Sequence, residues 1–326
     1  MKGIKSMNCI PIVFSVNDKF SKFASVAIQS IIENATIGHK YIIYVFYINL
    51  SKSNIDKLES QKNQYVEIKC VNINKYIELK NFYEIGDYTY EIYFRYYIPK
   101  ILKQYDKIIY LDSDIIIVED IAKLYYEDIG DKPIAAVTDF EHYMNNKNND
   151  FNSGVLVINT KEFERLQIRK KCIELIKLKK YDFPDQDALN EICKNNVYIL
   201  NPKYNYQVSL AYYHKFKKNI RKRNFKKLFQ EQPIIIHFSY ITKPIYNIFS
   251  KYNNEFWKYA KNTPYITELL EIYLNNQYEV LRNSPVEDIC IDLTEEGRFG
   301  IRKIMDIFWY QLKYWFLFKI KTDNRK

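Results

Sequence analysis

The chain has 326 residues, of which 47% are hydrophobic, and it carries a formal net charge of +10. This length can bury a large core in one large domain or two modest ones, and because no apolar run reaches 18 residues we expect no transmembrane helix. The five cysteines are scattered with no paired spacing, which argues against a disulfide framework or a zinc site and favours a reducing cytosol.

The first part of the chain alternates between strand-like and helix-like segments. Residues 10–16, 41–50 and 65–71 are apolar runs that predict strands, and residues 20–32 carry apolar side chains at helical spacing. Ser51 is placed to cap a helix after the second run. This order predicts a parallel or mixed α/β sheet with flanking helices. The sequence contains neither a P-loop nor the dinucleotide-binding glycine pattern after its first strand.

The next two predicted elements are a helix that contains Arg95 and a strand that is followed by Asp139. A helix is predicted over residues 90–102, where Arg95 stands among apolar residues and needs an anionic partner if it is buried. Residues 133–138 predict a strand, and Asp139 follows it directly.

Between these two elements, two carboxylates lie within a nearly continuous apolar run, residues 108–117. Asp112 and Asp114 are one residue apart, so an extended backbone would point both side chains to the same side. Open α/β sheets bind ligands at the carboxyl ends of their strands. Two adjacent ionised carboxylates repel each other unless a cation lies between them, and hard oxygen ligands suit Mg²⁺ or Mn²⁺. The alternative is a solvated strand end that carries two aspartates by chance.

The second half of the chain continues the alternation. A polar, asparagine-rich loop over residues 141–150 leads to a strand over residues 155–158, and residues 161–179 predict a charged helix. A further helix begins near Asp185, after a proline. A short apolar strand, residues 234–236, ends at His237, and imidazole is a common metal ligand.

Four stretches together resemble glycosyltransferase family 8, and they occur in the order in which that family has them. They are residues 108–117, 151–159, 185–190 and 237–244. The resemblance extends over about residues 8–250 and implies a GT-A type fold with a mixed central sheet. It also implies a metal-dependent enzyme that moves a hexose, galactose or glucose, from a UDP-sugar with retention of configuration. The acceptor would be a hydroxyl group of a cell-envelope glycan or a lipid-linked glycan.

The resemblance implies three groups of site residues. Asp112, Asp114 and His237 would hold Mn²⁺ or Mg²⁺, while Asp185 would contact sugar hydroxyls and Gln186 would face the reacting carbon. The residues expected to contact the donor are Asn17, Phe20, Arg95, Asp112, Ser113, Asp139, Asn152 and Lys243. Because the Gln186 amide is neutral and a poor nucleophile, we expect the acceptor to attack on the face that the diphosphate leaves. Gln186 would then stabilise a cation-like transition state.

Several of these residues also have a purely structural interpretation. Phe20 could be a core residue at a helix start, and Arg95 a surface residue. Asn152 could simply form a turn, and Asp185 could belong to a helix-capping cluster. His237 could be a hydrogen-bonded core histidine.

Three positions depart from the family pattern. Asn17 and Lys19 stand in the loop after the first strand, where the family contacts the base and ribose, and both differ from its usual residues. Tyr240 replaces a glycine in the block that begins at His237, beside the phosphate-binding Lys243. The resemblance therefore leaves these contacts, and their effect on activity, open.

Two basic segments account for much of the positive charge. Residues 215–227 contain eight Lys or Arg residues, and residues 301–316 place Trp and Phe on one helical face and basic residues on the other. Such a helix is typical of segments that lie on an anionic membrane, although packing on another protein surface is the alternative. We therefore predict a catalytic domain over 8–262 and a helical, basic extension over 263–326. With no signal peptide apparent at the N-terminus, we expect a cytoplasmic protein, peripheral on the inner face of the cytoplasmic membrane.

Two other classes of protein compete with this interpretation. A haloacid-dehalogenase-type phosphatase also uses Asp-x-Asp, but in its first strand, whereas Asp112 lies in mid-chain. A non-catalytic nucleotide-sugar-binding protein on the same scaffold would accommodate Asn17, Lys19 and Tyr240, because fold does not fix function. We expect no nucleic-acid partner, since no recognition motif accompanies the basic segments.

Overall fold

The structure is a computed structural model that describes residues 8–86, 88–139, 150–209, 231–239, 242–247 and 250–283. The strands are β1 (Asn8–Ser15), β2 (His39–Tyr47), β3 (Val66–Asn72), β4 (Lys107–Leu111), β5 (Ile115–Ile117), β6 (Ile134–Thr138), β7 (Phe151–Asn159), β8 (Val197–Ile199), β9 (Tyr206–Gln207) and β10 (Ile235–His237). The α-helices are α1 (Ser21–Asn34), α2 (Lys52–Ser60), α3 (Ile98–Ile101), α4 (Ala122–Tyr125), α6 (Thr160–Arg165), α7 (Ile168–Leu178), α8 (Pro184–Ile192), α11 (Asn253–Ala260) and α12 (Ile266–Asn283). Three short 3-10 helices are η1 (Leu79–Asn81), η2 (Tyr90–Tyr97) and η3 (Pro202–Tyr204).

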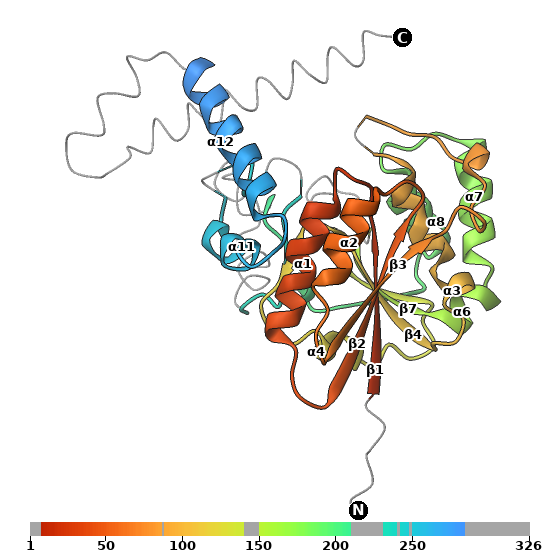
Figure 1. Ribbon diagram of the computed structural model, residues 1–326. Coiled ribbons are helices and arrows are strands. Elements are labelled where there is room, and N and C mark those ends of the chain that lie inside the picture. The colour runs from red at the N-terminus through yellow and green to blue at the C-terminus, as the bar shows by residue number, and fades with distance from the viewer. Residues whose placement is uncertain are drawn as a thin grey trace, which may run out of the picture. The chain divides into compact units, whose positions relative to one another are not determined.

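A seven-stranded mixed sheet forms the centre of the fold, in the order β3-β2-β1-β4-β7-β6-β8. Strands β1 to β4 are parallel to one another, and β7 runs antiparallel to both β4 and β6. Helices α1 and α2 lie on one side of this sheet, and α3, α6, α7 and α8 lie on the other (Figure 1). Because both faces are covered, the central strands β1, β2, β4 and β7 are apolar along most of their length, as is usual for buried parallel strands, whereas the edge strand β3 also carries Glu67 and Lys69. The mixed α/β architecture expected from the sequence is confirmed.

A second, three-stranded sheet lies where the chain leaves the first one. Its order is β5-β10-β9, with β10 antiparallel to β5 and parallel to β9. The chain leaves the larger sheet at the end of β4 and enters the smaller one at β5. Asp112 and Asp114 lie in this crossing, so residues of both sheets can meet there.

Three predicted elements differ in the structure. The stretch 108–117 is two strands, because Ser113 and its neighbouring aspartates interrupt it. The predicted helix 90–102 is a 3-10 helix followed by the short helix α3. Pro99 explains this break, since its ring would clash with the carbonyl four residues earlier in a continuous α-helix. The predicted helix 161–179 is divided into α6 and α7 at Gln167, whose φ of 55° is left-handed.

The chain divides into two compact units after Leu270. The expected boundary at 262/263 falls between α11 and α12, close to this division, and it stays a prediction. Residues 215–227 and 301–316, the two basic segments, lie outside the described residues. Within the described part, no helix is both long and apolar enough to cross a membrane.

Candidate active site

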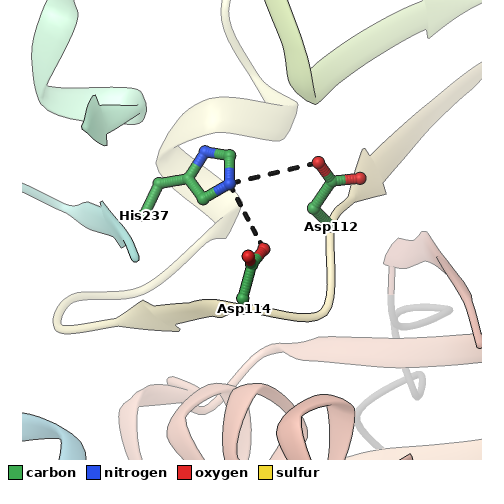
Figure 2. Close-up of side chains that lie close together, drawn as sticks. All are labelled: Asp112, Asp114 and His237. Carbon is green, nitrogen blue, oxygen red and sulfur yellow. Dashed lines mark ion pairs between the residues drawn. The ribbon is translucent and has the colours of Figure 1, made fainter. Parts of the chain in front are cut away.

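Asp112, Asp114 and His237 form a three-residue cluster at the junction of the two sheets. The His237 Nε2 atom lies 3.3 Å from Asp114 Oδ1 and 4.0 Å from Asp112 Oδ2. Figure 2 shows the imidazole nitrogen facing both carboxylates. One nitrogen and two carboxylate oxygens, all within 4.8 Å of one another, can hold a metal ion.

The backbone fixes where the two aspartates point. Asp112 N–H donates to the carbonyl of Gly154 at 2.7 Å, which extends the pairing of β4 with β7 by one residue. Asp114 instead belongs to the second sheet, and its carbonyl accepts from Phe238 N–H at 2.8 Å. The same crossing therefore places one carboxylate beside each sheet. His237 ends β10 opposite Ile115, which brings its ring between them.

A lysine and the histidine stabilise the charge on Asp114. Lys243 Nζ lies 2.8 Å from Asp114 Oδ2, on the oxygen that does not face the histidine. Burial alone would raise the pKa of Asp114, but Lys243 and His237 together hold it below its usual value. Burial likewise opposes the charged form of His237, yet Asp114 raises the His237 pKa overall. Lys243 and His237 therefore favour the ionised form of Asp114.

Arg95 lies behind the cluster and is 3% exposed. Its Nη2 contacts Asp112 Oδ1 at 3.0 Å, and its Nη1 contacts Asp185 Oδ2 at 3.0 Å and donates to the Ser153 carbonyl at 2.7 Å. The guanidinium also lies over the Tyr110 ring, 4.5 Å from its centroid. Arg95 is therefore not the surface residue of the alternative interpretation, and it has the anionic partners that a buried arginine was expected to need.

The expected sugar-side residues form one hydrogen-bonded group. Gln186 Nε2 donates to Asp139 Oδ2 at 2.8 Å, and Gln186 Oε1 accepts from the backbone N–H of Ser153 at 3.0 Å. Asp185 accepts from the Ser153 hydroxyl at 3.1 Å. Burial raises the pKa of Asp185 despite the opposing charge of Arg95. Asn152 precedes Ser153 in β7, and its Oδ1 accepts from the backbone N–H of Gly154 at 3.0 Å.

The residues expected around the nucleotide lie at the end of β1. Asn17 Oδ1 accepts from Phe20 N–H at 3.2 Å, while its Nδ2 donates to Thr89 and Glu91 at 3.1 and 3.2 Å. Phe20 precedes α1 and is partly exposed, so its ring is not fully absorbed by the core.

One expected donor contact, Ser113, and two departures from the family pattern, Lys19 and Tyr240, remain to be placed. Ser113 is buried between the two aspartates of the crossing. Lys19 Nζ lies 5.8 Å from the centroid of the Phe20 ring. Tyr240 lies outside the described residues.

Three contacting residues were not among the candidates from the sequence. Tyr110 donates its hydroxyl to Asp112 Oδ1 at 2.8 Å, and its position two residues before Asp112 in a strand was an available signal. Ser153 lay inside a recognised stretch. Asn205 meets His237 Nδ1 at 3.0 Å from a loop 32 residues away in sequence, and no local pattern marks it.

Comparison with known proteins places this site in a family. The model of glycosyl transferase family 8 matches residues 11–245, which include all of the site described above. The chain belongs to glycosyl transferase family 8. It is a glycosyltransferase, as the resemblance of its four stretches implied.

Three bacterial proteins are among the curated relatives of this glycosyltransferase. It is 28% identical to General stress protein A of Bacillus subtilis over 274 residues, which are 78% of this chain and 94% of that protein. It is 26% identical to Lipopolysaccharide 1,2-glucosyltransferase of Escherichia coli K12, over 75% of each chain. Glycosyltransferase GlyF of Streptococcus pneumoniae is 30% identical, and the match covers 62% of this chain and half of GlyF.

Solved structures of other glycosyltransferases share the fold. The galactosyltransferase LgtC, determined with donor and acceptor sugar analogues, matches with a TM-score of 0.64 at 20% identity, over 78% of this chain and 96% of LgtC. The bifunctional glycosyltransferase WbbM matches with a TM-score of 0.71 at 22% identity, over 83% of this chain and 53% of WbbM. These likenesses confirm the GT-A type architecture.

Proposed function

We propose that this glycosyltransferase moves a hexose, galactose or glucose, from a UDP-sugar to a hydroxyl group of a cell-envelope or lipid-linked glycan. The reaction would retain the anomeric configuration and depend on Mn²⁺ or Mg²⁺. The observation that carries the proposal is the cluster of Asp112, Asp114 and His237 with Lys243 at its edge. Two carboxylates and an imidazole nitrogen are a suitable ligand set for Mn²⁺.

The donor diphosphate would bind beside this cluster. A bound divalent ion would supply charge stabilisation for the departing diphosphate, a large contribution in such chemistry. Lys243 lies within reach of the same region, and its ammonium group can pair with a phosphate oxygen. The positive charges that favour departure of UDP would thus come together at one point.

The sugar would lie towards Gln186, Asp185 and Asn152. The Asp185 carboxylate is paired with Arg95 and the Ser153 hydroxyl, which lowers its ability to act as a nucleophile. This supports attack by the acceptor on the face that UDP leaves, with the Gln186 amide stabilising the developing positive charge. Recovery of a covalent sugar–enzyme adduct would contradict this part of the proposal.

The proposed acceptor and the proposed membrane location rest on observations other than the geometry of the site. The name of the Escherichia coli relative points to a lipopolysaccharide acceptor for that protein, and we propose an envelope glycan for this one. The basic aromatic segment 301–316 is the sequence feature behind the proposed contact with the inner membrane surface. Binding of full-length protein, but not of a chain ending at residue 283, to anionic vesicles would test that contact.

The reaction is tested by UDP release. Purified protein would receive UDP-glucose, UDP-galactose and their N-acetylated forms in turn, with Mn²⁺ or with chelator and with sugar acceptors. We expect metal-dependent release from one donor, lowered at least ~100-fold in Asp112→Ala and His237→Ala, which corresponds to about 2.7 kcal/mol. Asp131→Ala, an exposed carboxylate outside the cluster, is the matched control and should retain full activity.

One observation favours a second candidate, a non-catalytic nucleotide-sugar-binding protein. The Asn17 side chain, which departs from the family pattern, already bonds Thr89, Glu91 and the backbone of Phe20. Tight binding of UDP and Mn²⁺ with no release from any donor and acceptor pair would favour this alternative.

A further inference from the structure

The orientation of the Asn152 side chain can be assigned from a backbone donor. The N–H of Gly154 can only donate, and it lies 3.0 Å from one atom of the Asn152 amide. That atom must therefore be the oxygen, Oδ1, because an NH₂ group there would oppose another donor. This assignment does not depend on the protonation state of any side chain, because the donor is a backbone N–H.

The Asn205 orientation follows from that of Asn152. Asn205 is completely buried, and one of its amide atoms lies 2.8 Å from Asn152 Oδ1. If the Asn205 oxygen stood there, two amide oxygens would face each other at this short distance with no hydrogen between them. The atom is therefore the Asn205 NH₂ group, which donates to Asn152 Oδ1. The opposite end of the same amide, Oδ1, then faces His237 at 3.0 Å from Nδ1.

The proton on His237 follows in turn. Asn205 Oδ1 can only accept, so Nδ1 of His237 carries a hydrogen and donates to it. When a metal ion takes the place of a proton on Nε2, the ring is neutral, keeps its hydrogen on Nδ1 and turns its Nε2 lone pair to the ion. Nε2 is the atom that faces Asp114 Oδ1 at 3.3 Å and Asp112 Oδ2 at 4.0 Å. A lone pair aimed at two carboxylate oxygens is the arrangement that a shared cation requires.

We propose that Asn205 is a positioning residue that fixes the tautomer and ring direction of His237 for metal binding. Asn152 and the Gly154 backbone anchor it, so the chain of bonds joins β7 of the larger sheet to β10 of the smaller one. The inference rests on the proposed metal-dependent function and extends it to Asn205, whose side-chain hydrogen bonds are to His237 and Asn152. Bonds to the remote nitrogen of a histidine ligand typically change metal affinity by about 10–100-fold.

Two substitutions of Asn205 separate this role from simple packing. Asn205→Leu has a similar size but offers no acceptor to Nδ1, whereas Asn205→Asp keeps an acceptor oxygen. Asn34→Leu is the matched control, because Asn34 is partly buried and its side-chain amide donates to the backbone carbonyls of Ser30 and Ile117, which are not members of the cluster. Mn²⁺ binding to each full-length protein would be followed by the electron paramagnetic resonance signal of free Mn²⁺. Thermal unfolding of each variant would accompany it.

We expect Asn205→Leu to bind Mn²⁺ at least ~10-fold more weakly than the unchanged protein. Asn205→Asp should bind within a few-fold of it, and Asn34→Leu should lose stability but not affinity. Unchanged Mn²⁺ affinity in a folded Asn205→Leu protein would overturn the proposal. Failure of the unchanged protein itself to bind Mn²⁺, with or without UDP, would instead overturn the metal-dependent function.

A second measurement keeps the test decisive if Asn205→Leu does not fold. The chain has four histidines, so protein labelled with ¹⁵N-histidine gives few nitrogen signals, and His237→Gln assigns those of His237. Zn²⁺ is a diamagnetic ion that imidazole binds well. In the Zn²⁺-loaded protein, long-range ¹H–¹⁵N spectra should show the hydrogen on Nδ1 of His237. A hydrogen on Nε2 with the metal on Nδ1 would contradict the inference.

Discussion

Replacing Gly154 with alanine should damage the site without straining the backbone. A Cβ atom at this position would lie 2.5 Å from His237 Cε1, 2.7 Å from Asp112 Oδ2 and 3.0 Å from Asn152 Oδ1. Real Cβ atoms do not approach that closely, so neighbouring groups must move. Two of the three neighbours, His237 and Asp112, are candidate metal ligands, and the third, Asn152, bonds Asn205, the partner of His237.

The size of the effect follows from the distance to be regained. Non-bonded carbon atoms pack at roughly 3.5–4.0 Å, so the His237 ring must retreat by about 1 Å. A misplacement of about 1 Å can cost ~100-fold in rate, which corresponds to about 2.7 kcal/mol of transition-state stabilisation. We therefore expect Gly154→Ala to lower kcat/KM for UDP release about 100-fold and to weaken Mn²⁺ binding in parallel.

Gly130→Ala is the matched control for this substitution. Gly130 has a φ of +57°, and a Cβ there would meet nothing within 4 Å. A left-handed alanine costs roughly 1–2 kcal/mol, so Gly130→Ala should lower the free energy of unfolding and leave kcat/KM unchanged. Denaturant unfolding and UDP release, measured on both variants, separate the two effects. A Gly154→Ala protein with normal turnover and normal Mn²⁺ affinity would refute the packing argument.

Two further predictions concern stability and thiol chemistry. Arg95→Leu leaves two carboxylates without their buried partner and should lower the free energy of unfolding in urea by about 3–5 kcal/mol. Arg165→Leu removes an exposed ion pair and should lower it by less than about 1 kcal/mol. Equal losses of stability in the two variants would contradict this prediction. The second prediction is measured with a thiol reagent on the Cys290→Ser variant. The reagent should label exposed Cys9 quickly and Cys193 only after unfolding, because burial raises the pKa of Cys193 to about 12. Rapid labelling of both residues in the native protein would argue against the described core.

The order of strands and helices could be predicted because local sequence determines it. The apolar runs at 10–16, 41–50 and 65–71 are strands, and Ser51 caps α2 through a bond from Asn54 N–H. The break at Pro99 was also visible in the sequence, and the prediction of one helix over 90–102 was wrong because it did not take this proline into account. Spacing alone cannot show which sheet a strand joins, because pairing partners are distant in sequence.

The candidate site was predictable to the level of residue identity but not of contacts. The two aspartates were expected on one side of a single strand, yet the structure divides that strand between two sheets. They still approach one another because His237 lies opposite Ile115 at the sheet junction. Asn205 escaped prediction because its importance arises from what it touches in space. An asparagine before a two-residue strand resembles any loop residue in sequence.

Each candidate ligand uses one atom to bind the protein and leaves another facing the common centre. Asp112 Oδ1 accepts from Arg95 and Tyr110, so Oδ2 faces His237. Asp114 Oδ2 contacts Lys243, so Oδ1 faces the same nitrogen. His237 in turn gives Nδ1 to Asn205.

These holding groups come from η2, β4, the segment after β10 and the loop before β9, so the site forms only when both sheets are folded together. Preorganisation of this kind lowers the cost of ordering the ligands when an ion binds. It also means that the function depends on residues that the Asp-x-Asp pattern does not contain.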